Sequence, residues 1–266
     1  MALNDTDANR VRSIRLFKNV SDQALCALLK SASIRDVPRR MLLFNEGDQA
    51  SCLYNLMSGS VELFSERHDR RSTIGVVRSL KPFVLTSIVH DLYRLSARTL
   101  ERSELLLVPL KLIHNLIDTD PAFARAVTRE IAGDLLNIIE DFKNHRLRTT
   151  IERLAEWILR CDQDAGGTGR FVLPYGKRIL ASHLGMAPEN LSRNLASLAA
   201  LGVAVRGRHV SLNDRAALAE LARLEVHPEA HEAARAATEE TGSRRNFPDA
   251  GDESPSRART ARLLTS

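Results

Sequence analysis

A short stretch near the C-terminus, LGMAPENLSRNLASLAALG at residues 184–202, constrains the fold more than any other part of the chain. Gly185 permits a sharp turn, and Pro188 stands where a new helix begins, because proline is favoured at the first helical position. The leucines that follow recur at the spacing of one buried helical face: Leu191, Leu195 and Leu198. Upstream, KRILASHL predicts a first helix, with the small Ala181 where two helices cross closely. Two short helices joined by a tight turn predict a helix-turn-helix.

The face of the second helix opposite these leucines carries three polar side chains. Glu189, Ser192 and Arg193 have the i, i+3, i+4 spacing of neighbours on one face. Arginine can donate two hydrogen bonds to guanine, glutamate can accept one from cytosine, and serine can bond to a base or a phosphate. The alternative is that Glu189 stabilises the N-terminus of the helix and forms a surface ion pair with Arg193, which would contribute about 0.3–0.5 kcal/mol.

The sequence around this helix pair favours contact with DNA. Residues 170–212 contain six lysines and arginines against Glu189 alone, a surplus equal to the formal charge of +5 of the whole chain. A local basic surface is typical of proteins that bind the phosphate backbone. VAVRGRHVSL at 203–212 predicts a two-stranded wing, RFVLP a short strand, and NDRAALAELARLE a closing helix capped by Asn213.

Length and composition predict a globular protein of two domains. The chain has 266 residues, of which 44% are hydrophobic and 27% charged, enough for two modest cores. Because it has neither a run of about 18 apolar residues nor an apolar leader, we expect a cytoplasmic protein with no membrane partner. Cys26, Cys52 and Cys161 are scattered and odd in number, which predicts reduced thiols and no metal site.

The middle of the chain changes from a β pattern to a helical one. Between about residues 35 and 110, short runs rich in bulky apolar residues alternate with turn signals, which predicts a small β-barrel or jelly roll. A short helix capped by Ser21 precedes these runs, and residues 1–13 are polar and expected to be loose. Asp120 and Pro121 then give a strong start signal for a helix of about 25 residues.

That long helix carries an apolar stripe with spacings of 4, 4, 3 and 4: Val127, Ile131, Leu135, Ile138 and Phe142. Such a stripe either packs on the helix's own domain or pairs with its twin in a homodimer. Pairing is favoured if the C-terminal part binds a two-fold DNA site.

The last part of the chain, residues 226–266, is poor in apolar bulk and mixed in charge, so we expect it to be disordered. Its basic residues are either part of a solvated tail or a source of weak nonspecific DNA affinity: Arg244, Arg245, Arg257, Arg259 and Arg262.

Taken together, LASHLGMAPENLSRNLASLAALGVAVRGRHVSL, FNEGDQASCLYNLMSGSVELF and DPAFARAV resemble the bacterial regulators related to the cyclic AMP receptor protein and the fumarate-nitrate reduction regulator. The resemblance covers about residues 15–224, and its specific part is the E-x-x-S-R element of the second helix. It implies an α+β fold, with a cyclic-nucleotide-binding-like β-roll sensor domain, a dimerisation helix and a winged helix-turn-helix. The corresponding ranges are 1–119, 120–147 and 148–225, followed by the tail at 226–266.

The same resemblance implies a transcription regulator that binds double-stranded DNA as a homodimer and contacts RNA polymerase. Glu189, Ser192 and Arg193 would contact the bases of inverted TTGAT-type half-sites. The residues that the resemblance assigns to phosphate contacts are Lys177, Arg178, Ser182, Arg206, Arg208 and His209.

The resemblance leaves the effector open. Cyclic-nucleotide binders of this kind use Gly-Glu for the ribose and Arg-Ser for the phosphate, but residues 80–97 contain neither Gly nor Glu, and Leu95 precedes Ser96 where the arginine is expected. Arg94 lies one position away. The N-terminal cysteines of iron-sulfur members are also missing. The subgroup that controls nitrate respiration looks nearest, and it implies haem as a candidate, with His90 as axial ligand in an apolar stretch and His68 and His114 as weaker candidates.

Two other classes of function remain as alternatives. In the first, the chain is a ligand-binding module whose helix-turn-helix contacts protein. In the second it is an enzyme, which the sequence does not favour: Ser182 and His183 are adjacent rather than placed across a pocket, and no Gly-rich phosphate loop follows a strand.

Overall fold

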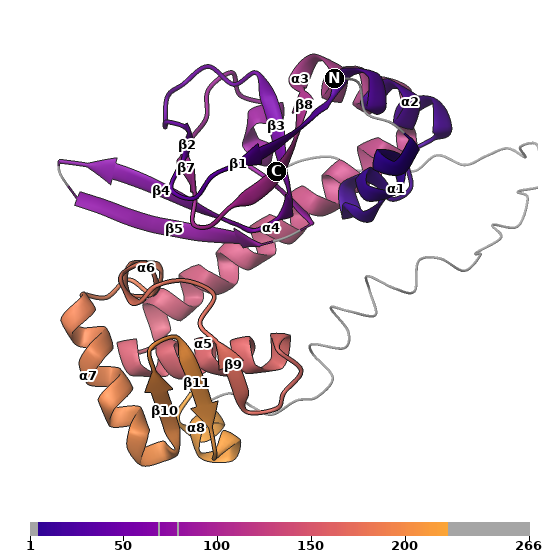
Figure 1. The fold of residues 1–266 in the computed structure, drawn as a ribbon. Coiled ribbons are helices and arrows are strands. Elements are labelled where there is room, and N and C mark those ends of the chain that lie inside the picture. Colours follow the sequence, from indigo (N-terminus) through magenta and orange to yellow (C-terminus); the bar gives the residue numbers. More distant parts are fainter. Residues whose placement is uncertain (1–4, 69, 79, 223–266) are drawn as a thin grey trace, which may run out of the picture. The chain divides into compact units, whose positions relative to one another are not determined.

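The computed structural model describes residues 5–68, 70–78 and 80–222, and these residues form an α+β fold (Figure 1). The α-helices are α1 (Asp5–Ser13), α2 (Asp22–Ser31), α3 (Leu110–Thr119), α4 (Pro121–Leu147), α5 (Thr150–Asp164), α6 (Lys177–His183), α7 (Pro188–Leu198) and α8 (Arg215–Leu221). The 3₁₀ turns are η1 (Arg15–Phe17), η2 (Leu85–Ile88) and η3 (Ala199–Leu201). The predicted tail at 226–266 lies outside the described residues.

Eight consecutive strands of the described chain build two four-stranded antiparallel sheets, as the alternating sequence predicted. They are β1 (Ser33–Val37), β2 (Leu42–Phe44), β3 (Cys52–Ser58), β4 (Ser60–Arg67), β5 (Arg70–Arg78), β6 (Lys81–Phe83), β7 (Ser96–Thr99) and β8 (Ser103–Pro109). The strand orders are β1-β8-β3-β6 and β2-β7-β4-β5. Buried side chains from both sheets, such as Phe44, Leu56 and Phe83, form the core between them. This arrangement is the predicted β-roll.

The N-terminal helices cover the outer side of the β1-β8-β3-β6 sheet. Val11 and Ile14 are fully buried there with Phe17, so residues 5–13 are helical and packed rather than loose. The prediction for this segment was wrong because only Val11 and Ile14 mark its buried face. Ser21 caps α2 as predicted, since its hydroxyl accepts a hydrogen bond from the backbone of Ala24 at 3.2 Å.

The long helix α4 begins at the predicted cap. One carboxylate oxygen of Asp120 accepts from the backbone N–H groups of Ala122 and Phe123 at 3.0 and 3.1 Å, and the other accepts from Ser21 at 2.9 Å. The bond from Ser21, followed by those from the helix, holds the pKa of Asp120 below its usual value. The cap therefore ties the starts of α2 and α4 together. None of the helices in the described ranges is long and apolar enough to cross a membrane.

The C-terminal part packs around a separate core that contains the helix-turn-helix. Its three short strands β9 (Arg170–Val172), β10 (Val203–Arg206) and β11 (His209–Leu212) pair in the order β10-β11-β9. The core includes Leu154, Ile158, Leu180 and Leu198, each at most 1% exposed. The closing helix α8 is capped by Asp214, which accepts from Ala217 at 2.9 Å, and not by Asn213 as predicted, because the chain turns one residue later.

Candidate nucleic-acid interface

The helix pair α6 and α7 adopts the predicted geometry. Gly185 has a φ of +62°, a conformation that favours glycine, and a Cβ atom at this position would lie 2.7 Å from the ring of His145, which would have to move. The inward side chains are buried as expected: Ala181 at 0%, Leu184 at 7%, Leu191 at 1% and Leu198 at 0% exposure. Leu195 is partly exposed and packs against the same core. These contacts fix which side of α7 faces outward.

The outward side of α7 carries the three predicted side chains. Glu189, Ser192 and Arg193 are all exposed. Within residues 80–222, Arg193 donates to the side-chain oxygen of Asn190 and forms no ion pair with Glu189, so the surface pair considered as the alternative is not present. The Ser192 hydroxyl donates to the carbonyl of Pro188 at 3.1 Å and keeps its acceptor lone pairs exposed. The face therefore offers a carboxylate, a hydroxyl and a guanidinium together.

Asn190 was not among the predicted site residues. It lies on the flank of the exposed face of α7, where its amide oxygen holds the Arg193 side chain. A polar residue three positions before an arginine on one helix was the available signal, because i and i+3 side chains are neighbours.

The candidate phosphate contacts fall into two groups in the structure. Lys177 and Arg178 in the first turn of α6, and Arg206 and His209 in the wing, are exposed. The wing turns at Gly207, which has a φ of +63°. The remaining two already have protein partners: the Ser182 hydroxyl accepts from the backbone N–H of Thr73 at 2.8 Å, and Arg208 donates to the carbonyl of Leu173 at 2.6 and 2.9 Å.

The interior of the β-roll does not provide the groups that bind a cyclic nucleotide in the resembling proteins. An aromatic cluster occupies it, in which the rings of Phe44 and Tyr93 stack with centroids 4.0 Å apart and those of Tyr54 and Phe83 lie 5.6 Å apart. Ser96 is 6% exposed, and its hydroxyl accepts from the backbone of Glu46 at 2.9 Å. Arg94 is exposed. The residues present therefore do not fit a cyclic nucleotide.

The histidines proposed as haem ligands do not lie in apolar pockets. His90 is exposed and follows Val89, which is 73% exposed, because η2 buries Leu85 and Ile88 instead. Since a haem ligand stands beside an apolar cavity, the structure argues against His90 in this role. His114 bonds to the carbonyl of Ile88 at 2.8 Å, and His68 lies in the exposed turn between β4 and β5. In the described part of the chain, no three His, Cys, Asp or Glu side chains gather as a metal site.

The predicted stripe on α4 divides into two parts. Val127 is 5% exposed and packs in the core beside Phe123, so it does not belong to an intermolecular surface. The other four side chains are exposed: Ile131 at 42%, Leu135 at 56%, Ile138 at 64% and Phe142 at 61%. The helix leaves its own core after Val127, and from there its apolar face is only partly covered within the described chain.

Comparison with known proteins agrees with this architecture. Residues 152–221 match the Crp-like helix-turn-helix domain family, and residues 34–120 match the cyclic nucleotide-binding domain family. The anaerobic regulatory protein of Pasteurella multocida is 23% identical over 193 residues, which cover 70% of this chain and 71% of that protein. The fumarate and nitrate reduction regulatory protein of Escherichia coli K12 is 24% identical over 196 residues, which cover 71% of this chain and 78% of that protein.

The fold is also similar to that of a solved structure. FixK2 from Bradyrhizobium japonicum superimposes with a TM-score of 0.66 at 24% identity, over 71% of this chain and 96% of that one. The β-roll, the long helix and the winged helix pair are thus found together in other proteins in the same order. The chain belongs to the superfamily of bacterial transcription regulators related to the cyclic AMP receptor protein and the fumarate and nitrate reduction regulator.

Proposed function

We propose that this regulator binds inverted TTGAT-like half-sites as a homodimer, with the exposed face of α7 in the major groove. One observation supports the proposal most: Glu189, Ser192 and Arg193 are exposed together at the N-terminal end of a helix whose opposite side is buried. The N-terminal residues of a recognition helix are those that contact base edges. Arg193 would donate to guanine, Glu189 would accept from cytosine, and Ser192 would bond to a base or phosphate.

The phosphate contacts follow from exposure. Lys177, Arg178, Arg206 and His209 flank α7 on the first helix and the wing, so they are the stronger candidates. Arg208 uses its guanidinium within the fold, and Ser182 would have to leave Thr73 before it contacted a phosphate. These side chains would position the domain on the duplex without selecting a sequence.

The homodimer would form along the exposed apolar face of α4. Ile131, Leu135, Ile138 and Phe142 continue at heptad-like spacing, and Leu136 and Ile139 are 67% and 44% exposed beside them. Large apolar side chains gathered on one helix favour an intermolecular surface, and a two-fold DNA site favours a second copy of this chain as the partner.

Three further assignments complete the proposal. RNA polymerase is a partner by analogy with related regulators, and the cytoplasm is the location where both partners are found. We also propose domain boundaries after residues 119, 147 and 225. DNA binding would be regulated by a change in how the two sensor domains are placed relative to the two DNA-binding domains of the dimer.

The test compares Arg193→Ala with Lys177→Ala on an inverted TTGAT-like duplex and on random DNA. We expect Arg193→Ala to weaken binding to the specific duplex by about 5–150-fold and to leave binding to random DNA unchanged. Lys177→Ala should weaken both and lower the salt dependence by about one phosphate contact. Equal loss on both duplexes for Arg193→Ala would contradict a base contact. Equal binding of the wild-type protein to both duplexes with little salt dependence would favour the protein-contact alternative.

A further inference from the structure

The connection between the long helix and the DNA-binding domain is very short. Helix α4 ends at Leu147 and α5 begins at Thr150, so that only Arg148 and Thr149 join them. Arg148 is extended, with φ −114° and ψ 145°. Thr149 caps α5 in a reciprocal capping box, because its backbone donates to Glu152 at 2.7 Å and its hydroxyl accepts from Glu152 at 3.4 Å.

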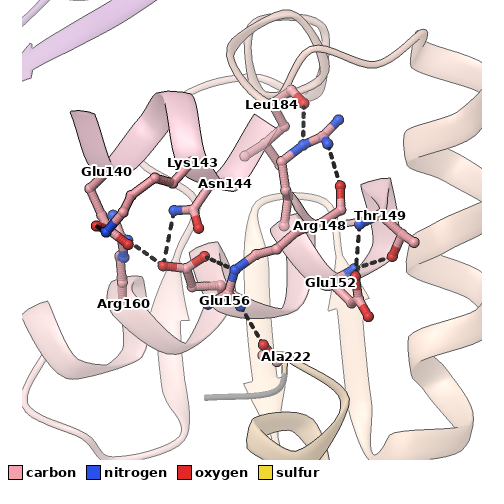
Figure 2. A network of polar contacts seen from close by, with 11 residues as sticks. Glu140, Lys143, Asn144, Arg148, Thr149, Glu152, Glu156, Arg160, Leu184 and Ala222 are labelled. Carbon is pink, nitrogen blue, oxygen red and sulfur yellow. Dashed lines mark hydrogen bonds and ion pairs between the residues drawn. The ribbon is translucent and has the colours of Figure 1, made fainter. Parts of the chain in front are cut away.

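A buried carboxylate lies across this joint. Glu156 in α5 is 5% exposed, and Figure 2 shows its side chain pointing between α4 and the joint. One oxygen accepts from the side-chain amide of Asn144 at 3.3 Å and from Arg160, and the other pairs with Arg148 at 3.5 Å. A buried charge is stable only where such partners satisfy it, and removing a partner is strongly destabilising. Glu156 therefore connects the last turn of α4, the joint and α5.

Arg148 of the joint and Arg153 of α5 extend these contacts to two more helices, at Ala222 and Leu184 (both labelled in Figure 2). Arg148 donates to the carbonyl of Ala222 at the end of α8. Arg153 donates to the carbonyl of Arg148 at 2.8 Å and to that of Leu184, at the end of α6, at 3.2 Å. Helix α8 is thus bonded to Arg148 of the joint, and α6 is bonded to α5 through Arg153. Helix α7 is bonded to the start of α5, because the side-chain amide of Asn194 donates to the hydroxyl of Thr150 at 3.1 Å.

We propose that Glu156 is a positioning residue that locks α4 to the helix-turn-helix, so that this joint fixes the half-site spacing the dimer accepts. The inference rests on the proposed function, since spacing has meaning only for two DNA-binding domains joined by a dimer. Shifting one half-site by one base pair moves it about 3.4 Å along the duplex and rotates it about 35°. A dimer with rigid joints cannot follow that shift, whereas one with loosened joints can.

The experiment measures the affinity of the full chain for duplexes whose two half-sites are separated by the preferred spacing or by one base pair more or less. Wild-type protein should prefer one spacing by about tenfold or more over its neighbours. Glu156→Gln removes the charge that Arg148 and Arg160 share but keeps the shape and an acceptor for Asn144. We expect its spacing preference to fall to about threefold or less, with unchanged affinity for random DNA.

Glu140→Gln is the matched control. Glu140 is an acid near the same end of α4, but its carboxylate is 48% exposed and pairs only with Lys143, at 3.1 Å, among the contacts drawn in Figure 2. This variant should keep the wild-type spacing preference. A folded Glu156→Gln protein that also keeps the full preference would overturn the inference.

A second variant covers the case in which Glu156→Gln does not fold, as judged by its thermal unfolding. Arg148→Lys keeps the positive charge but cannot bond to both Glu156 and Ala222 with a planar fork. It should also reduce the spacing preference. An unchanged preference would again contradict the role proposed for the joint. If wild-type protein shows no preference for any inverted repeat over random DNA, the proposed function itself fails, a result that is distinct from failure of the joint.

Discussion

Glu62 in the β-roll and Glu189 in α7 are both glutamates near arginines, but they are used in opposite ways. Glu62 is 1% exposed and accepts from Thr73 at 2.7 Å, from Arg98 at 2.8 Å and from Arg71 at 3.3 Å. Glu189 is exposed and forms no ion pair with Arg193. The β-roll pairs the carboxylate of Glu62 within the protein, whereas α7 leaves that of Glu189 exposed. The same residue type therefore stabilises the fold at one position and is accessible to a partner at the other.

The largest effect should separate these two acids. Glu62→Ala removes the buried carboxylate with which Arg71 and Arg98 pair. It should lower the free energy of unfolding by about 3–5 kcal/mol, as the loss of one partner of a buried ion pair does. Glu189→Ala should change it by less than about 0.5 kcal/mol, because the side chain is exposed. Urea unfolding followed by circular dichroism measures both. Similar losses for the two variants would remove the contrast between the domains.

The next effect concerns the exposed face of α4. Leu135→Asp or Phe142→Asp should abolish the dimer and reduce affinity for a two-fold site by about 100-fold or more, because linked half-sites gain avidity from the dimer. Val127→Asp should instead unfold the N-terminal core, since Val127 is buried within its own chain. Analytical ultracentrifugation distinguishes the cases. A Phe142→Asp protein that remains a dimer would place the interface elsewhere.

A smaller effect is expected in the wing. Arg206→Ala should weaken binding to all duplexes by a few-fold and reduce the salt slope by about 0.9, because an exposed phosphate contact releases about one counterion. Arg208→Ala should destabilise the domain as well, since its guanidinium bonds to Leu173. Fluorescence anisotropy at several salt concentrations is the measurement. A change in sequence preference for Arg206→Ala would indicate a base contact instead.

The smallest effect is a pH dependence of the DNA-binding domain. Burial lowers the pKa of His183, and burial followed by the nearby Arg153 lowers that of His145, from the ordinary value of 6.5. The unfolded chain therefore binds protons first, so stability should be constant above about pH 6.5 and should fall as the pH drops toward the folded pKa values. Thermal melts across this range should show the fall diminished in His183→Gln. If the stability of His183→Gln falls with pH as steeply as that of the wild-type protein, other groups cause the pH dependence.

The sequence predicted those parts of the molecule that depend on short-range rules. The helix pair and its exposed face could be predicted because their signals, Gly185, Pro188 and the leucines of α7, lie within a few residues of one another. The spacing of the α4 stripe could not show where the helix leaves its own core, and Val127 was therefore placed on the wrong side of that boundary. His90 was a candidate haem ligand because it lies in an apolar stretch, but the short turn η2 buries Leu85 and Ile88 and leaves Val89 and His90 exposed.

The contacts at the joint were beyond prediction because they connect distant residues. Asn144 and Glu156 are 12 positions apart, and Arg148 and Ala222 are 74 apart. The available signal was Glu156 itself, an acid among the buried positions of α5.

Whether α7 contacts base edges is tested most directly by the affinity of wild-type protein for an inverted TTGAT-like duplex and for random DNA over a range of salt concentrations. We expect both affinities to fall as salt rises, and the specific duplex to be bound about 10³-fold more tightly than random DNA, or better, at every salt concentration. Equal affinity for the two duplexes at every salt concentration would contradict contact between α7 and base edges.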